Sequence, residues 1–213
     1  DDQLTCAVTS LALQAQLLSS ASQGITYQWA TPNGLILSGG NGPNPNIGAP
    51  GTYLVTVTDA MNGCTGTDQL LITQDINLPT ALIVTPNILT CTVQQVDLNT
   101  TGSSSGTNFE YQWSTPSGSF VSTQNPQQPI VNEPGVYDLL LTNNSNGCTQ
   151  IATVTVLEDI QAPSVEAGVA SVLDCDTPTQ MLNGVGSSIG ANFSYTWTTP
   201  SGQILSGGNT LTP

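Results

Sequence analysis

Cysteine thiols and carboxylates are the side chains of this sequence whose types could carry chemistry. The 213 residues include five Cys and 14 Asp or Glu, but no Lys, Arg or His. Without imidazole there is no base to activate a Ser or Cys nucleophile, and without Lys there is no amine for Schiff-base formation. Carboxylate pairs act in glycosidases and aspartic proteases, but these acids are mostly scattered along the chain. We therefore expect that the protein is not an enzyme.

The formal net charge of −14 excludes two classes of partner. No cation can neutralise phosphates, so nucleic-acid binding has no electrostatic basis. Anionic membrane surfaces are excluded for the same reason, and no run of 18 apolar residues predicts membrane insertion of this segment. Because 38% of the residues are hydrophobic, we expect a folded chain rather than a disordered one.

Four short motifs recur along the chain at one fixed interval, with a single one-residue slip. The interval is about 84 residues, and recurrence at a fixed period is the sequence signature of tandem repeats. All five cysteines and all three tryptophans belong to these motifs. The motifs are Tyr-x-Trp followed by Thr-Pro-x-Gly (Trp29, Trp113, Trp197), Leu-x-Cys (Cys6, Cys91, Cys175), Pro-Gly-x-Tyr (Tyr53, Tyr137) and Asn-Gly-Cys-Thr (Cys64, Cys148).

Within each repeat, apolar side chains alternate with polar ones, which is typical of strands with one buried face. Tyr53, Val55 and Val57 alternate in this way, and turn residues separate the short apolar runs. The Tyr and Trp of each Tyr-x-Trp motif share one strand face, so we expect them to pack between two sheets. The sequence therefore predicts an all-β fold of tandem antiparallel β-sandwiches with about 84 residues per repeat.

The expected domains are residues 1–78, 79–162 and 163–213, arranged as beads on a string. The first sandwich lacks its first strand, the second is complete, and the third contains only its first half. The connections around residues 74–79 and 158–163 are short and contain Pro, which predicts restricted angles between neighbours. Both ends of the sequence fall inside a repeat, so we expect the polypeptide to continue in both directions.

The cysteines of the first two repeats predict one disulfide within each sandwich. The interval from Cys6 to Cys64 equals that from Cys91 to Cys148 to within one residue. On the same spacing, the expected mate of Cys175 lies about 57 residues beyond it, outside this chain. Two isolated cysteines per domain without His make a poor zinc site, which is the alternative. Disulfides predict an oxidising location, extracellular or at the cell surface.

Two further sets of residues are candidate sites. Asp75 and Asp159 are the acids that recur with the repeat, at the domain junctions. No cofactor is expected: an interdomain calcium ion held by these carboxylates is the one candidate, and the favoured interpretation is that they accept local N–H bonds in a turn. Asn-x-Ser/Thr sequons, which are glycosylation acceptors in some secreted proteins, occur at Asn99, Asn143 and Asn192.

The chain resembles the PKD-like and immunoglobulin-like repeats of bacterial surface proteins, and most of all the tandem repeats of large Bacteroidota cell-surface adhesins, including gliding-motility adhesins. The resemblance lies in Tyr-x-Trp-x-Thr-Pro-x-Gly and in the segment from Tyr53 to Asp59, which matches the PKD pattern Tyr-x-Val-x-Val-Thr-Asp. The second repeat has Asn143 in place of that Asp. The resemblance implies an extracellular stalk or adhesive fibre of many repeats and implies no chemistry.

Two functions remain from the sequence. The first is a structural extracellular fibre or adhesin shaft, whose partners are neighbouring repeats of the same long chain and lateral copies in a filament. The second is a module that binds surface glycans or matrix proteins and is displayed on such a stalk. It would need an exposed aromatic groove, yet aromatic residues make up only 5% of the chain and the core accounts for most of them.

Overall fold

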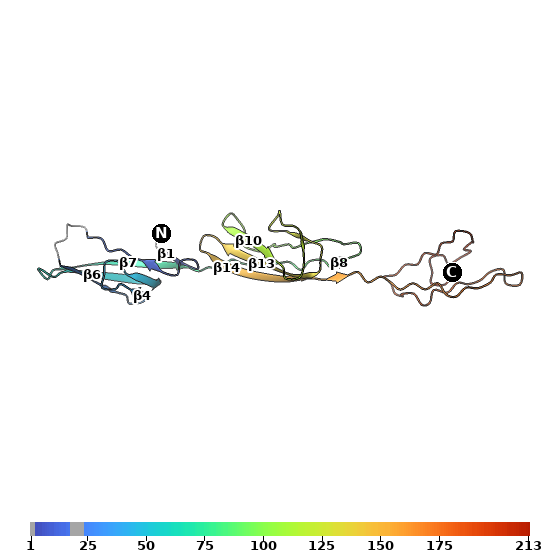
Figure 1. Cartoon of the computed structure of the whole chain (residues 1–213), viewed down its shortest axis with the longest axis horizontal. Helices are drawn as coiled ribbons and strands as arrows, with labels where there is room; N and C mark the ends of the chain where they lie inside the picture. Colours follow the sequence, from blue (N-terminus) through green and yellow to red (C-terminus); the bar gives the residue numbers. More distant parts are fainter. Residues whose placement is uncertain (1–2, 18–23) are drawn as a thin grey trace. The chain divides into compact units, whose positions relative to one another are not determined.

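The computed structural model describes residues 3–17 and 24–213, which form two compact units (Figure 1). Unit 1 is Asp1–Asp159 and unit 2 is Ile160–Pro213. Parts of the expected domain 1–78, namely residues 1–2 and 18–23, lie outside the described residues. The described part of the chain contains strands and no helix, which confirms the predicted all-β class. No helix there could cross a bilayer.

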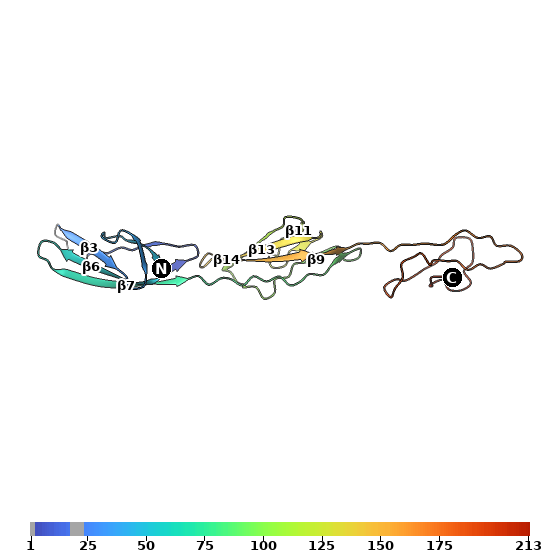
Figure 2. The same ribbon diagram turned by 90° about the horizontal axis from the view of Figure 1, so that it is seen from below.

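Residues 3–17 and 24–75 form sandwich 1, in which two sheets face each other. One sheet has the order β1-β7-β6-β3 and the other β2-β5-β4. Figure 2 shows β3, β6 and β7 together in one layer. The strands are β1 (Gln3–Thr5), β2 (Leu11–Ala12), β3 (Ile25–Ala30), β4 (Leu35–Ser38), β5 (Asn46–Ala49), β6 (Gly51–Asp59) and β7 (Thr65–Asp75).

Residues 80–159 form sandwich 2, which repeats the same arrangement. Its sheets have the orders β10-β13-β14 and β11-β12-β9, and β8 pairs with β15. The strands are β8 (Leu89–Thr90), β9 (Val96–Asp97), β10 (Phe109–Ser114), β11 (Phe120–Ser122), β12 (Ile130–Val131), β13 (Gly135–Asn143), β14 (Cys148–Val156) and β15 (Glu158–Asp159).

Each sandwich has its own hydrophobic core, built from the alternating positions that the sequence indicates. In sandwich 1, Trp29 and Tyr53 are buried between the sheets with Ile47 and Ile72. The core of sandwich 2 contains Tyr137, and Trp113 packs against it. The expected packing of the Tyr-x-Trp side chains holds in sandwich 1, where Tyr27 packs against the core beside Trp29, whereas in sandwich 2 Trp113 is only half-buried and Tyr111 lies outside the core cluster. The core clusters span residues 4–72 and 89–156, so the two cores share no residue.

The tyrosine after Pro-Gly anchors the loop that contains Thr-Pro-x-Gly. The hydroxyl of Tyr53 donates to Ala49 O at 2.6 Å and accepts from Leu35 N at 2.9 Å. A Cβ on Gly34 would overlap the phenol ring, so only glycine fits there. Tyr137 makes the same pair of bonds in sandwich 2, and burial raises the pKa of its phenol. The two motifs therefore recur together because they are one packing unit.

Two short parallel strand pairs depart from the antiparallel prediction. In sandwich 1, β1 lies parallel to the end of β7, with Thr5 opposite Asp75. In sandwich 2, β8 lies parallel to β15, with Thr90 opposite Asp159. Each pair brings the Leu-x-Cys segment to the end of the sandwich where the last strand leaves it. We call this the linker end, and we call the opposite end, where the Asn-Gly-Cys turn lies, the hairpin end.

Unit 2 contains no assigned strand, yet it keeps the hydrogen bonds of the repeat. The indole N–H of Trp197 donates to Thr210 O at 2.9 Å, as Trp113 donates to Pro126 O at 2.8 Å. Leu182 N donates to Pro213 O, as Leu98 N does to Pro129 O. Unit 2 therefore adopts the local conformation of the first half of a repeat, in agreement with its sequence.

Candidate functional site

The one disulfide of the described residues crosses from sandwich 1 to sandwich 2. It joins Cys6 to Cys148, with a Cα–Cα distance of 5.0 Å and a sequence separation of 142 residues. The predicted pairs Cys6–Cys64 and Cys91–Cys148 are therefore wrong. The cysteines do form a disulfide, but it holds the joint between two repeats instead of closing a loop within one.

The length of the last strand explains why the predicted pairing fails. Cys64 immediately precedes β7, whereas Cys6 follows Thr5, which lies opposite the last residue of that strand. The 11 residues of β7 separate the two cysteines by roughly 35 Å at about 3.3 Å per residue. A disulfide requires Cα atoms about 4.4–6.8 Å apart. The two cysteines of one sandwich thus lie at opposite ends of it.

Asn146 fixes the joint beside the disulfide. Its side-chain N–H groups donate to Asp75 Oδ1 at 3.1 Å, at the linker end of sandwich 1, and to Asn77 O at 3.0 Å, in the linker that follows. Its own Oδ1 accepts from Cys148 N at 3.0 Å, and its backbone carbonyl accepts from Ala7 N at 3.2 Å. Asn146 is only 2% exposed, and both the nitrogen and the oxygen of its side-chain amide are hydrogen-bonded.

Asp75 acts as a hydrogen-bond acceptor at this joint. Its Oδ1 accepts from the backbone and side-chain N–H groups of Asn77 as well as from Asn146. The backbone bond from Asn77 is the largest of these effects, and together they lower the pKa of Asp75 below its usual value of 3.8. No group of three or more His, Cys, Asp or Glu in the described chain could hold a metal ion. Neither Asp75 nor Asp159 therefore belongs to a carboxylate cluster that would support the candidate calcium site.

Gly147 allows the two sandwiches to approach closely. It has a φ of +70°, which favours glycine, and a Cβ built on it would overlap the Cβ of Ala7. The equivalent Gly63 has a similar φ of +74°, but a Cβ on it would meet nothing within 4 Å. In both sandwiches this glycine allows the positive φ of the Asn-Gly-Cys turn. In sandwich 2 it also allows the close contact with sandwich 1.

A tight turn presents the cysteine of each Leu-x-Cys segment. Thr5 Oγ1 accepts from the N–H groups two and three residues later, and Thr90 Oγ1 does the same in sandwich 2. In unit 2, Asp174 Oδ1 takes this role, and bonds from Thr177 and Asp176 lower its pKa. The cysteine follows the acceptor directly, so Cys6, Cys91 and Cys175 occupy the same place in the same turn.

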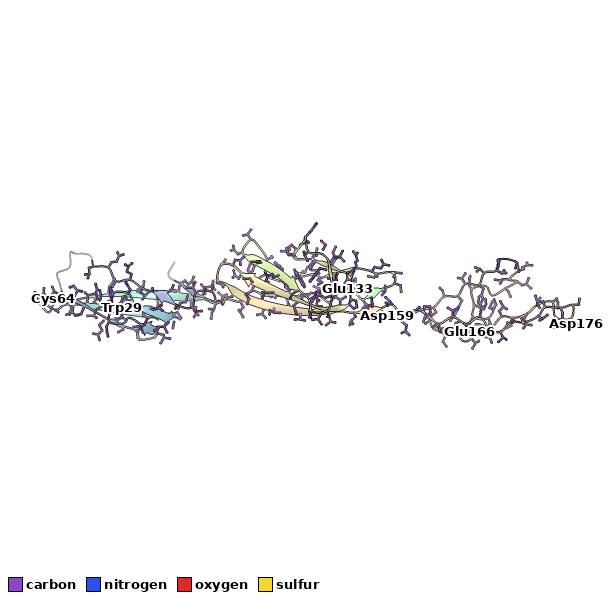
Figure 3. All side chains as sticks on the ribbon, viewed as in Figure 1. Trp29, Cys64, Glu133, Asp159, Glu166 and Asp176 are labelled. Carbon is purple, nitrogen blue, oxygen red and sulfur yellow. A yellow bond between two sulfur atoms is a disulfide. The ribbon has the colours of Figure 1, made fainter. Side chains whose placement is uncertain are left out.

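The remaining cysteines take no part in the Cys6–Cys148 disulfide, whereas the sequon residue Asn143 lies in the turn that contains Asn146. Cys64 and Cys175 are exposed free thiols, and Cys91 is also exposed. Figure 3 shows Cys64 at the hairpin end of sandwich 1, away from Trp29. Asn192 is exposed, whereas Asn99 and Asn143 are half-buried and accept backbone N–H bonds in turns. Glycosylation of these three residues stays a prediction.

The residues that sequence reasoning missed are Asn146, Gly147 and Asn77. The first two belong to the Asn-Gly-Cys motif, whose recurrence can be recognised in the sequence. Their contact partners, however, lie far away in the sequence and outside sandwich 2. Asn77 follows the recurrent Asp75 by two positions, and its equivalent is Gln161.

Comparisons with known proteins give remote matches to solved structures only. No family model and no curated protein matches the chain. Three N-terminal domains of the outer capsid protein Hoc of bacteriophage RB49 align with 18% identity over 77% of this chain and 57% of that one, with a TM-score of 0.39. Drosophila OTK extracellular domains 3–5 align with 12% identity over 80% of this chain and 65% of that one, with a TM-score of 0.32. Sidekick-1 immunoglobulin domains 1–5 align with 10% identity over 76% of this chain and 38% of that one, with a TM-score of 0.35. The chain thus spans less than two thirds of each.

With TM-scores of 0.32 to 0.39, these matches carry no argument about the fold or the function of this chain. The strand order and the two facing sheets of each sandwich define an all-β, immunoglobulin-like architecture.

Proposed function

We propose that this chain is a segment of a structural extracellular shaft, in which β-sandwich repeats are fixed to one another and no catalysis takes place. The observation that carries the proposal is the Cys6–Cys148 disulfide, because it immobilises a joint between domains instead of stabilising one of them. A long surface filament or adhesin stalk needs such joints in order to hold its direction. A disulfide is also typical of an extracellular or cell-surface location.

The polar contacts at the joint support the same function. Three hydrogen bonds and one disulfide join the hairpin end of sandwich 2 to sandwich 1 and its linker, and Asn146 and Cys148 are almost completely buried there. Flexible linkers between independent binding modules need none of these contacts. The partners of this shaft are neighbouring repeats of the same polypeptide, with lateral copies and surface glycans as further candidates.

The aromatic residues give little support to the alternative, a carbohydrate- or matrix-binding module. Trp29 is buried, and the hollow of about 410 Å³ in unit 2 is lined by Phe193, Tyr195 and Trp197. The equivalent residues of sandwich 2 belong to β10, which pairs along its whole length with β13. The aromatic residues of this hollow are therefore equivalent to residues of a paired strand in sandwich 2, which gives no support to a dedicated ligand groove.

Nitrogen-15 relaxation of the 213-residue chain tests the proposal. A fixed joint predicts one rotational correlation time for sandwich 1 and sandwich 2, and two shorter times after Cys6→Ser combined with Asn146→Ala. Independent tumbling of the unaltered sandwiches would contradict the shaft. Specific binding on a glycan array would instead favour the carbohydrate-binding alternative.

A further inference from the structure

The turn that forms the joint in sandwich 2 is present again at the hairpin end of sandwich 1, but there it is exposed. Asn62 Oδ1 accepts from Cys64 N at 2.8 Å, as Asn146 Oδ1 accepts from Cys148 N at 3.0 Å. In sandwich 2 this turn is covered by sandwich 1, and Cys148 is completely buried. In sandwich 1 the same turn is exposed, and Cys64 carries a free thiol. The same backbone and the same side chains are thus present in a covered and an uncovered copy.

The linker end recurs in the same way. Thr90 lies opposite Asp159 in a parallel pair, as Thr5 lies opposite Asp75. Thr90 Oγ1 accepts from Thr92 N and Val93 N, so the turn that presents Cys6 to Cys148 also presents Cys91 at the linker end of sandwich 2. Unit 1 therefore contains a second copy of each half of the Cys6–Cys148 joint. The Asn-Gly-Cys turn recurs at the hairpin end of sandwich 1, and the Leu-x-Cys turn recurs at the linker end of sandwich 2.

We propose that every joint of this repeat is closed by a disulfide from the Leu-x-Cys cysteine of one repeat to the Asn-Gly-Cys cysteine of the next. Cys91 pairs with the Asn-Gly-Cys cysteine one repeat after Cys148, and Cys64 pairs with the Leu-x-Cys cysteine of a preceding repeat. The partner in each case is a neighbouring repeat of this same type. The inference goes beyond the shaft function, because it assigns cysteine partners and needs no particular adhesive role.

The chemistry of each joint is a two-electron oxidation. Two thiols lose two protons and two electrons as the S–S bond forms. A small-molecule disulfide such as oxidised glutathione accepts them through a mixed disulfide and leaves as two thiols. The oxidising surroundings that disulfides require supply such an acceptor.

This pairing creates two continuous covalent paths, which we call tracks. Each track runs through linkers and disulfides and leaves out most of the backbone of the folded sandwiches. A track enters at an Asn-Gly-Cys cysteine, follows the backbone to the next Leu-x-Cys cysteine, and leaves through a disulfide. Cys148 to Cys175 is such a segment of one track, and Cys64 to Cys91 is a segment of the other. Each step of a track advances the shaft by two repeats, so the tracks alternate along it.

The tracks limit how far tension can stretch the shaft. One segment of about 27 residues reaches roughly 90–100 Å when fully extended, at about 3.3–3.6 Å per residue. Two reduced and unfolded repeats contain about 168 residues and would reach roughly 550–600 Å on the same scale. Oxidation therefore shortens the greatest possible extension about six-fold, even if every sandwich unfolds.

Disulfide mapping of the natural full-length polypeptide tests the pairing. Thiols are blocked with N-ethylmaleimide, and the protein is digested with pepsin at acidic pH, because the chain offers trypsin no Lys or Arg. Mass spectrometry should find the Cys91 peptide linked to the next Asn-Gly-Cys peptide, with Cys6–Cys148 as the internal control. Linkage of Cys91 to Cys148, or N-ethylmaleimide on Cys64 or Cys91, would overturn the proposal. If the two sandwiches still tumble together, the shaft function survives that result.

Stretching the same polypeptide in optical tweezers gives a second, independent measurement. The contour length at high force should increase about six-fold when a reductant is added. An equal contour length with and without reductant would overturn the two-track arrangement.

Discussion

Gly147 of sandwich 2 lies so close to Ala7 of sandwich 1 that a single additional methyl group would overlap the alanine side chain. The contact sits between the disulfide and the hydrogen bonds of Asn146. Since both residues are at the surface of their own sandwich, the close approach depends on the docking of two domains. The joint can therefore be perturbed without touching either core.

Gly147→Ala should weaken the joint more than Gly63→Ala does. Both substitutions place alanine at a positive φ, which costs about 1 kcal/mol or more. Only Gly147→Ala adds the clash with Ala7, because Gly63 has open space around it in this chain. Denaturant unfolding of the two variants should show the larger loss of stability for Gly147→Ala. Equal losses would mean that the sandwiches do not dock at this turn.

The contribution of Asp75 to the joint should depend on pH. Hydrogen bonds lower the pKa of Asp75 in the folded protein, so the unfolded chain binds a proton more readily than the folded one does. The resulting stability is present above the ordinary pKa of about 3.8 and is lost as the pH falls through the lowered folded value. Melting temperatures of the unaltered chain and of Asp75→Asn should differ at pH 6 and converge towards pH 2.

Asp68→Asn provides the matched control for this measurement. Asp68 is on the same strand, and its carboxylate accepts only from the N–H of Gln69 among the bonds of the described chain. Its substitution should leave the joint unchanged at every pH. A pH-independent difference for Asp75→Asn would show that the charge of Asp75 plays no part in the joint.

Tyr53→Phe should destabilise sandwich 1 by about 1–3 kcal/mol, the usual cost of leaving buried polar groups without a partner. The substitution keeps the buried ring but leaves Leu35 N and Ala49 O without the hydroxyl that joins them. Tyr27→Phe is the control, because it removes a hydroxyl from a half-buried tyrosine that packs against the same core. The free energy of unfolding measures both effects. A loss for Tyr53→Phe no larger than that for Tyr27→Phe would contradict the proposed anchoring of the loop.

The sequence predicted the fold because each sandwich is encoded locally. Alternation at Tyr53, Val55 and Val57 identifies the buried face of β6, and the repeat period transfers the same assignment to β13. The parallel pairing of β1 with β7 could not be predicted in this way. It joins only three residues to the far end of the domain, which is too short for any pattern to reveal.

The predicted disulfide pairing is wrong for a related reason. The repeat period relates Cys6 to Cys91 and Cys64 to Cys148, but the same spacing fits pairing within a repeat and between repeats equally well. The choice depends on which end of the sandwich each cysteine occupies, and the parallel edge strand decides that. A periodic sequence thus identifies equivalent residues, whereas their partners follow from three-dimensional structure.

Cys6→Ser should destabilise unit 1 and uncouple its two sandwiches. The disulfide closes a loop of 142 residues, for which chain entropy gives a contribution of about 5 kcal/mol as an upper figure. Cys6 is exposed, so serine introduces no buried polar group. Cys64→Ser is the matched control, because it replaces an exposed cysteine that has no disulfide in this chain. Denaturant unfolding without reductant should show a loss of several kcal/mol for Cys6→Ser and almost none for Cys64→Ser. With reductant present, all three proteins should unfold alike, and a difference that persists would mean that Cys6 contributes through packing and not through the bond to Cys148.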